Sequence, residues 1–308
     1  IHVMDGRKFV QQAGARYEDG LEPDDSEETG NDAEQGESQG VYYTPLYLVD
    51  FVLDKVLPWS GPAATPRVLD PACGSGAFLV RAFQRMVFRW RQENTGEEPP
   101  IDFLRSLITQ NLFGVDVSPK AIRVASLALY LALCDEIDPK HYWTRIRFPN
   151  LRGTTLKEGD FFAEDIAGFR TIGDCGNYDL VVGNPPWGDK SLSQKAEKWA
   201  EAHEWPVSEG KMGILFLPKA AVLAAANGRV SMVQPAQALL FNQSTKTVSA
   251  RRKLFSEFAV EEVVNLSALR RHLFPHSTDP CALVTLSPHA AHKHTIEYWC
   301  PKASPSSD

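Results

Sequence analysis

The sequence lacks the long apolar runs and paired cysteines that mark several large classes of protein. No stretch of about 18 uninterrupted apolar residues occurs, and the best candidate, 212–226, is interrupted by Pro218 and Lys219. No basic segment followed by an apolar one stands at the start. The five cysteines include no Cys-x-x-Cys pair, so neither a disulfide framework nor a cysteine-rich zinc site is expected. We therefore expect a reduced, cytoplasmic protein without a membrane span.

Basic residues are missing from one stretch, Glu18 to Glu37, which holds ten acidic residues. The chain of 308 residues has a net charge of -7, and outside this stretch 29 acidic residues face 32 basic ones. The remainder is mildly basic, at about +3, which is compatible with nucleic-acid binding but not diagnostic of it. Because 17–39 has hardly any apolar side chains, we interpret it as a disordered linker within an N-terminal segment, 1–39. The alternative is that this acidic segment mimics DNA and occupies a basic cleft, which it would open or close to DNA.

The hydrophobic content of 43% allows one large α/β domain or two small ones. A helix is predicted after Thr44, which can cap it, with Pro45 at its first position. A long polar segment, 188–212, is interpreted as a mobile loop. Further helices are predicted from 77, over 118–134, over 213–226 and over 249–257. Strands are predicted at 68–69, 112–116, 156–162, 178–183, 228–233, 260–266 and 281–286.

Acidic residues stand at or near the ends of three successive predicted strands. Asp70 is followed by Gly74-Ser75-Gly76, a turn in which the backbone can approach a ligand closely at a helix start. An acid at the first strand's end suits a cationic group, Asp116 suits a ribose diol, and Asp160 suits an adenine amino group with Phe161 packing on the ring. Each acid alone could be a helix cap or loop residue. Together they describe S-adenosylmethionine.

The predicted strand 178–183 ends in a rigid polar tip, Asn184-Pro185-Pro186-Trp187. Asn184 offers a side-chain carbonyl oxygen and Pro185 a backbone one, while the prolines remove flexibility and donors. Two acceptors that face one exocyclic amino group would hold it and increase the electron density on its nitrogen. Trp187 offers a flat face for a stacked base. In isolation, an ordinary β-turn is the alternative, since Asn-Pro is a common turn dipeptide.

Asp70 to Leu79, taken with Asn184 to Trp187, resembles the N6-adenine DNA methyltransferases of bacterial restriction–modification and phage-defence systems. The likeness extends from about Gly40 to Leu286 and is close to type I modification subunits, type IIG enzymes and BREX- or DISARM-like methylases, in the γ order of motifs. It implies an α/β, Rossmann-like, seven-stranded mixed sheet with helices on both faces and the last strand antiparallel. It also implies one catalytic domain, 40–300, followed by a polar tail, 301–308.

The resemblance further implies the residues of the site. The segment around Phe274 resembles the one that supplies a second aromatic wall, so Phe274 and Trp187 would sandwich the target base. A plain core aromatic is the alternative for Phe274. The implied catalytic residues are Asn184, Pro185, Pro186 and Trp187. The implied S-adenosylmethionine contacts are Tyr43, Thr44, Pro45, Asp70, Ala72, Gly74, Gly76, Phe78, Asp116, Val117, Asp160, Phe161 and Asn184.

The implied reaction is methyl transfer from S-adenosylmethionine to N6 of an adenine flipped out of double-stranded DNA, with S-adenosylhomocysteine as product. Positioning and electrostatics suffice for it, without a metal or a covalent enzyme intermediate. Basic residues at 251–253 and 270–271 are candidates for phosphate contacts, a solvated helix face being the alternative. These are Arg251, Arg252, Lys253, Arg270 and Arg271.

The specificity element is expected outside these residues. The chain ends about 20 residues past the last predicted strand, with no target-recognition domain and no recognisable nuclease motif. We therefore expect a recognition domain or partner subunit elsewhere, with other defence-complex proteins as further partners. Two alternatives stay open. One is a methyltransferase for guanine N2 of RNA or for protein glutamine, and the other is a non-catalytic, cofactor-binding subunit of a defence complex.

Overall fold

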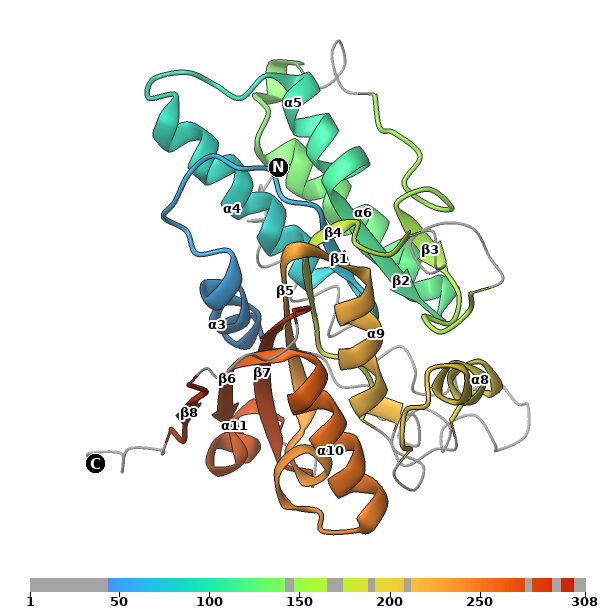
Figure 1. Cartoon of the computed structure of the whole chain (residues 1–308). Coiled ribbons are helices and arrows are strands. Elements are labelled where there is room, and N and C mark those ends of the chain that lie inside the picture. Colours follow the sequence, from blue (N-terminus) through green and yellow to red (C-terminus); the bar gives the residue numbers. More distant parts are fainter. Residues whose placement is uncertain are drawn as a thin grey trace, which may run out of the picture.

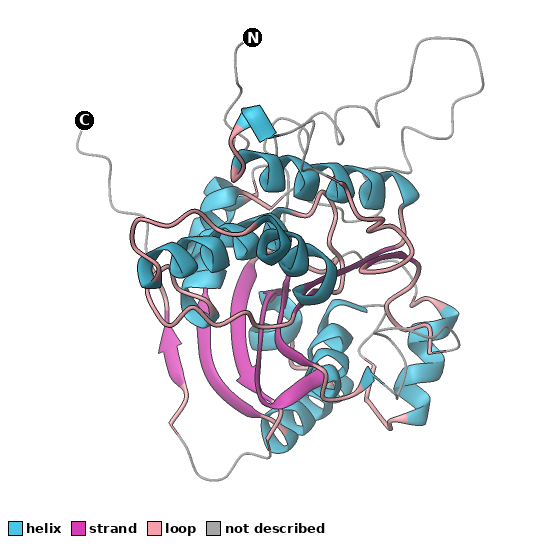
Figure 2. Ribbon diagram, turned by 90° about the horizontal axis from the view of Figure 1, so that it is seen from above, coloured by secondary structure: helices cyan, strands magenta, loops and turns pink. Residues whose placement is uncertain are grey.

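One mixed β-sheet with helices packed on both faces makes up the described chain (Figures 1 and 2). The computed structural model describes residues 44–141, 147–164, 174–187, 192–207, 212–274, 279–289 and 295–301. The acidic linker predicted at 17–39, Tyr43 and nearly all of the polar tail lie outside these residues. No helix in the described ranges is long and apolar enough to cross a membrane.

The described sheet has eight strands in the order β3-β2-β1-β4-β5-β7-β6-β8. The first five in this order run parallel, β7 is antiparallel to both β5 and β6, and β8 is parallel to β6. Their bounds are β1 (Val68–Asp70), β2 (Leu112–Asp116), β3 (Leu156–Glu158), β4 (Tyr178–Gly183), β5 (Ala224–Pro235), β6 (Ala259–Asn265), β7 (Cys281–Ser287) and β8 (Glu297–Trp299).

Eight strands correct the predicted number of seven, and the antiparallel strand is the seventh but not the last. The additional strand, β8, has three exposed residues at the edge of the sheet. It therefore has no buried apolar pattern that the sequence could reveal. The mixed α/β architecture itself is confirmed, as are the predicted bounds of β2 and β4.

The helices depart from prediction mainly in the polar part of the chain. The loop predicted over 188–212 contains α8, which Ser193 caps by accepting a hydrogen bond from the Ala196 N–H at 3.1 Å. The helix predicted to reach residue 226 ends at Leu223, because the chain enters β5 at Ala224 to pair with β4. The α-helices are α3 (Leu46–Val56), α4 (Ala77–Glu93), α5 (Ile101–Ser106), α6 (Pro119–Asp135), α8 (Gln194–Ala202), α9 (Phe216–Leu223), α10 (Thr245–Glu257) and α11 (Arg270–Leu273). Short 3-10 or π turns are η1 (Leu107–Asn111), η2 (Pro139–His141), η4 (Met212–Leu215), η5 (Gln237–Phe241) and η6 (Ser267–Leu269).

Two hydrophobic clusters cover the two faces of the sheet. The first joins α3, α4 and α6 to one face and includes Trp187 and Phe274. The second joins α8, α9 and α10 to the other face and includes Phe161 and Phe216. The alternation of side chains along β4 divides its residues between the two clusters, with Val182 in the first and Val181 in the second. The residues after β4 are therefore held from both sides.

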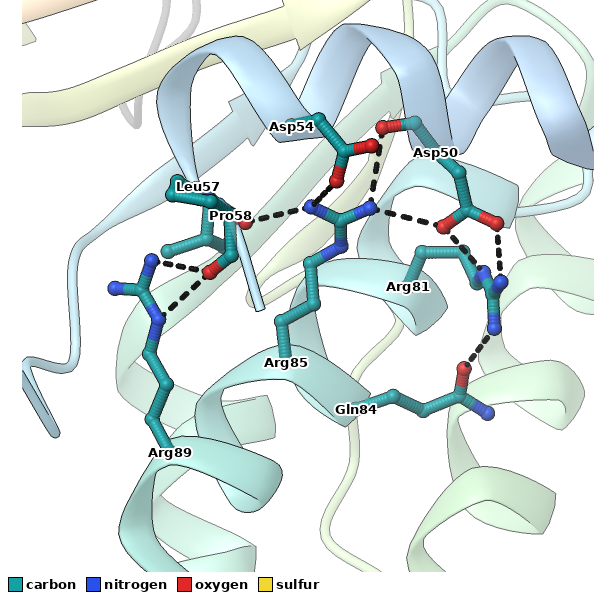
Figure 3. Close-up of polar contacts among 8 residues, drawn as sticks. All are labelled: Asp50, Asp54, Leu57, Pro58, Arg81, Gln84, Arg85 and Arg89. Carbon is teal, nitrogen blue, oxygen red and sulfur yellow. Dashed lines mark hydrogen bonds and ion pairs between the residues drawn. The ribbon is translucent and has the colours of Figure 1, made fainter. Parts of the chain in front are cut away.

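A row of three arginines on α4 fastens α3 to it (Figure 3). Arg81, Arg85 and Arg89 are spaced by four residues, so they lie on one face of the helix. Arg81 and Arg85 both donate to the Asp50 carboxylate, and Arg85 also donates to the Leu57 carbonyl oxygen at 2.7 Å. Arg89 donates to the next carbonyl along the chain. The carbonyl groups of Leu57 and Pro58, which directly follow α3, thus receive charged donors, and this fixes the position of α3.

Arg85 is 0% exposed, so its replacement tests this attachment. Methionine fills a similar volume but cannot donate to Asp50 or Leu57. We expect Arg85→Met to lower the free energy of unfolding by about 1.5–3 kcal/mol, as for the loss of hydrogen bonds to charged groups. Urea unfolding followed by circular dichroism measures the change. The control is Arg105→Met, whose exposed ion pair with Asp102 is worth at most about 0.5 kcal/mol. Equal losses in the two variants would contradict the attachment.

Candidate active site at the carboxyl edge of the sheet

The carboxyl ends of β1, β2 and β4 meet at one edge of the sheet. Their order is β2-β1-β4, with Asp70 opposite Gly114 of β2 and Leu69 opposite Val181 of β4. Asp116 closes β2, and Asn184 directly follows β4. Two predicted acids and the predicted polar tip are therefore brought to the same edge, which is where open α/β sheets bind ligands.

Gly74 and Gly76 form the predicted turn between β1 and α4. Their φ angles are +50° and +84°, a region that favours glycine, and Gly76 stands immediately before the first residue of α4. A Cβ on Gly76 would lie 3.1 Å from Ala125 of α6, whereas a Cβ on Gly74 would meet no atom within 4 Å. Gly76 thus serves close helix packing, and Gly74 faces open space that a ligand can approach.

Asp116 holds this turn against β2. One carboxylate oxygen accepts a hydrogen bond from the Gly74 N–H at 2.9 Å, and the other accepts from the Ser118 N–H at 2.8 Å. Burial raises the pKa of the Asp116 carboxyl, and these two N–H groups oppose the rise. Each oxygen keeps a further lone pair for another donor. The neighbouring Val117 is 68% exposed, which leaves an apolar surface beside the carboxylate.

Asp70 is a buried carboxyl group that approaches the backbone of β4. It is 1% exposed, and Oδ1 accepts a hydrogen bond from the Ala72 N–H at 3.1 Å. None of the ion pairs in the described ranges includes it. Burial raises the pKa of Asp70 to about 8, with a further rise from the charge of Asp116 and an opposing contribution from the Ala72 N–H. A cationic ligand at this carboxyl would reverse that rise.

Gly183, which the sequence reasoning did not single out, makes this approach possible. A Cβ at this position would lie 2.7 Å from Oδ1 of Asp70, well inside van der Waals contact. The signal was available in the sequence, because a glycine ends an otherwise apolar strand directly before the polar tip.

The Asn184 side chain is fixed at one end and unpaired at the other. Its Nδ2 donates to the Thr44 hydroxyl oxygen at 3.0 Å. Its Oδ1 is buried and has no hydrogen-bond partner in the described chain. A buried acceptor without a partner costs about 1–3 kcal/mol, so this oxygen is a ready site for a donor from a ligand.

Thr44 corrects a prediction. The helix α3 begins at Leu46 with Pro45 as the preceding residue, and no side chain caps it. Thr44 therefore does not cap the helix, and Pro45 is not its first residue. The hydroxyl group instead contacts Asn184, 140 residues further along the chain. A contact over such a distance has no local signal in the sequence.

The structure brings Trp187 and Phe274 together as predicted, but their rings contact each other directly and leave no gap for a base. The ring centroids are 4.8 Å apart with an angle of 79° between the planes, and the side chains are 2% and 3% exposed. A base between two parallel rings needs about 7 Å, or two stacking distances of about 3.5 Å. In this conformation the two rings pack on each other as part of the core.

The adenine pair predicted at Asp160 and Phe161 lies after β3, whose last residue is Glu158 rather than the predicted Phe162. Asp160 Oδ1 accepts a hydrogen bond from the Phe162 N–H at 2.8 Å. The Phe161 ring is buried and stacks on Phe216 of α9, with centroids 5.3 Å apart. The ring therefore serves the core in this structure, as does the predicted cofactor residue Phe78 in the first turn of α4.

The basic residues predicted to contact DNA phosphates differ in whether their charged groups are exposed or already hydrogen-bonded within the protein. Lys253 donates to the carbonyl oxygens of His203 and Glu204, each at 2.9 Å, and so closes the end of α8. Arg251 donates to a carbonyl oxygen within η5 at 3.2 Å. On α10 and α11 the exposed guanidinium groups are those of Arg252 and Arg271, with Arg270 half-buried.

Two further buried polar residues were not anticipated. Gln234, near the end of β5, is buried with no hydrogen-bond partner for either side-chain atom among the described residues. Lys219 of α9 pairs with Glu164 at 2.9 Å and lies over the Phe161 and Phe162 rings. Burial lowers the pKa of Lys219. Within the described ranges, no group of three or more His, Cys, Asp or Glu residues could hold a metal ion.

Comparison with known proteins places this chain in a family. Among curated proteins, the adenine-specific methyltransferase PglX of Streptomyces coelicolor is 28% identical over 186 residues, which are 49% of this chain and 15% of PglX. Among solved structures, the DrdV–DNA complex has a TM-score of 0.68 at 15% identity and covers 98% of this chain and 31% of that one. A type I restriction–modification methyltransferase subunit from Streptococcus thermophilus has a TM-score of 0.57 at 17% identity, covering 83% and 48%.

Because their sequence identities are low, the two solved structures support the fold alone. The chain spans only 15% of the length of PglX. The family model of the Eco57I restriction-modification methylase matches residues 110–271, just over half of the chain, and this segment includes β2, β4 and the polar tip. The chain belongs to the Eco57I restriction-modification methylase family.

Proposed function

We propose that this chain is the catalytic core of an adenine-specific DNA methyltransferase of a restriction–modification or phage-defence system. The matched family and the adenine-specific methyltransferase PglX support this assignment. Residues 40–300 would form one catalytic domain that acts in the cytoplasm. The recognition of a DNA sequence would come from a domain or partner subunit outside these residues.

The observation that carries the proposal is the unpaired Oδ1 of Asn184. It is a buried acceptor at the end of a strand, with its amide fixed by Thr44 and with Asp70 against the preceding residue. An exocyclic amino group of a nucleobase would supply the missing donor. A buried, preorganised acceptor interacts more strongly with such a group than water does, because it needs no reorganisation.

The chemistry of the strand ends fits S-adenosylmethionine, the methyl donor implied by the family. Asp70 would hold the ammonium group of its amino acid end, and the remaining lone pairs of Asp116 would accept from the ribose hydroxyls. The open space beside Gly74 would let the ligand approach the backbone of the turn closely. The exposed side chain of Val117 would pack on the adenine ring of the ligand. When bound, S-adenosylmethionine supplies an electrophilic methyl group on a positively charged sulfur.

The polar tip would act on the target adenine. Asn184 Oδ1 and the Pro185 carbonyl oxygen would accept hydrogen bonds from the N6 amino group, which orients its nitrogen and increases its electron density. The adenine would have to leave the duplex, since its amino group is unreachable within the base stack. Trp187 and Phe274 would separate to receive it, and Arg252 and Arg271 are the exposed groups that suit nearby phosphates.

Removal of the Asn184 amide tests the proposed function. We expect the full-length protein with Asn184→Ala to lose at least about 100-fold in methyl transfer, as when a preorganised polar group is removed from other sites. The affinity for S-adenosylmethionine should change less than about threefold, because the amide faces the base. Single-molecule sequencing for N6-methyladenine in cells, and calorimetry on the purified protein, measure the two quantities.

The matched control is Asn150→Ala, an exposed asparagine away from the sheet edge, which should keep both properties. Methylation of RNA or protein, but not DNA, by the unmodified protein would overturn the choice of substrate. A collapse of cofactor affinity in Asn184→Ala would instead place Asn184 in the cofactor site.

The raised pKa of Asp70 predicts that cofactor binding releases a proton. With a pKa of about 8, the carboxyl is protonated at pH 6.5 in the free protein, and an ammonium group beside it would ionise it. We expect the binding of S-adenosylhomocysteine at pH 6.5 to release close to one proton, measured by calorimetry in buffers of different ionisation enthalpy. The released fraction should fall as the pH rises through 8. Asp70→Asn should abolish the release, and proton release that persists in this variant would refute the assignment.

A further inference from the structure

The Gln234 side chain is a buried amide at the end of β5. It is 1% exposed, and neither Nε2 nor Oε1 has a hydrogen-bond partner among the described residues. Three positions earlier in β5, the buried hydroxyl group of Ser231 is hydrogen-bonded to that of Thr285 in β7 at 2.9 Å. A buried polar group without a partner destabilises the native state, whereas an apolar side chain in its place would not. Gln234 is therefore a candidate for contact with a ligand.

The pairing of the strands places Gln234 beside the polar tip. Strand β5 runs parallel to β4, and the last pair in their register is Gly183 with Met232. When this register is continued by two residues, Gln234 comes level with Pro185. The amide thus belongs to the same sheet edge as the tip, one strand further along.

A glycine of η4 joins the end of β5 to the tip. A Cβ on Gly213 would lie 3.2 Å from the Pro186 carbonyl oxygen and 3.4 Å from the Pro235 ring. The tip and the residue that follows Gln234 therefore pack against the same backbone position. This contact is independent of the strand register and supports the same placement.

Asn184 and Gln234 flank the tip from opposite faces of the sheet. Along β5, Val233 belongs to the hydrophobic cluster that includes α3, and Met232 belongs to the cluster that includes α9. Because side chains alternate along a strand, Gln234 shares the face of Met232. The Asn184 amide contacts Thr44, directly before α3, and so lies on the other face.

The two groups by which the tip would hold an amino group, Asn184 Oδ1 and the Pro185 carbonyl oxygen, are both acceptors. In adenine the amino group is flanked by two ring acceptors, N1 on one side and N7 on the other. The ring nitrogen on the Pro185 side would need a donor, which the tip does not provide. We propose that Gln234 is a specificity-determining residue whose Nε2 donates to this ring nitrogen of the flipped-out adenine. This inference rests on the proposed function, in which the tip binds the adenine amino group.

The contact does not require a preset orientation of the amide. Both ends of the Gln234 amide are unpaired within the described chain, so a rotation of 180° breaks no hydrogen bond. Glutamine pairs with adenine through its donor and its acceptor together. In such a pair Nε2 faces the ring nitrogen and Oε1 faces the amino group. The base itself therefore selects the orientation, and a base without this ring nitrogen would lose the contact.

Replacement of Gln234 by methionine separates this role from a structural one, because methionine is similarly long and unbranched but has no amide. In the full-length protein, we expect Gln234→Met to lower kcat/KM for methylation of its DNA target site about 5- to 100-fold, the range for one contact to a base. The urea midpoint should stay equal to that of the wild type or rise, since an unpaired buried amide is removed. A lower urea midpoint with unchanged kcat/KM would overturn the proposal in favour of a structural role.

The matched control is Gln92→Met, which removes an exposed amide on α4 and should change neither quantity.

Base analogues identify the atom that Gln234 contacts. In the target site, found by sequencing for N6-methyladenine, the adenine is replaced by 7-deazaadenine or by 1-deazaadenine. Each analogue exchanges one ring nitrogen for a C–H group and keeps the amino group. We expect the wild type to be about 5- to 100-fold more sensitive than Gln234→Met to one of the two analogues, because the variant has already lost the donor. Equal sensitivity of the two proteins to both analogues would overturn the inference.

The same measurements separate this inference from the proposed function. A wild type that methylates adenine in DNA, but responds to both analogues as Gln234→Met does, would refute the contact of Gln234 alone. A wild type that methylates RNA or protein but not DNA would refute the proposed function, and this inference with it.

Discussion

The close approach of the Asp70 carboxyl group to the backbone of Gly183 joins the two halves of the site. It is possible only because β1 and β4 are parallel neighbours and because residue 183 has no Cβ. The same carboxyl group is kept from water, which raises its pKa. A cation held beside it would reverse that rise. Because Gly183 of β4 has no Cβ, the Asp70 carboxyl group of β1 can lie against the residue that precedes Asn184.

The second constraint is the attachment of α3, which connects the sheet edge to the helix layer. Through Arg85 it depends on a guanidinium group that is wholly buried and bonded to the neighbouring helix. The N-terminal end of α3 then presents Thr44 to Asn184. The contact between Thr44 and the Asn184 amide therefore depends on where α3 lies against α4.

Local patterns in the sequence predicted the parts of the fold that have local causes. The apolar runs that end in Asp116 and Gly183 gave β2 and β4 their bounds, and Ser118-Pro119 marked the start of α6. Contacts between distant segments were not predictable, because a row of arginines has the same pattern whether it faces water or Asp50. Likewise, α8 buries only a narrow strip of an otherwise polar surface, and nothing near Thr44 indicates a partner 140 residues away.

Under the proposed function, the edge-to-face contact between Trp187 and Phe274 would determine when a base can enter the site. The space for a base is filled by protein rather than by water, so a base can arrive only after two core side chains have moved apart. The rate of docking would then follow the opening frequency of the aromatic wall, on the microsecond-to-millisecond scale of such motions, instead of the rate of diffusion. Most encounters with DNA would end before the wall opens, and only a base held in place for long enough would be methylated.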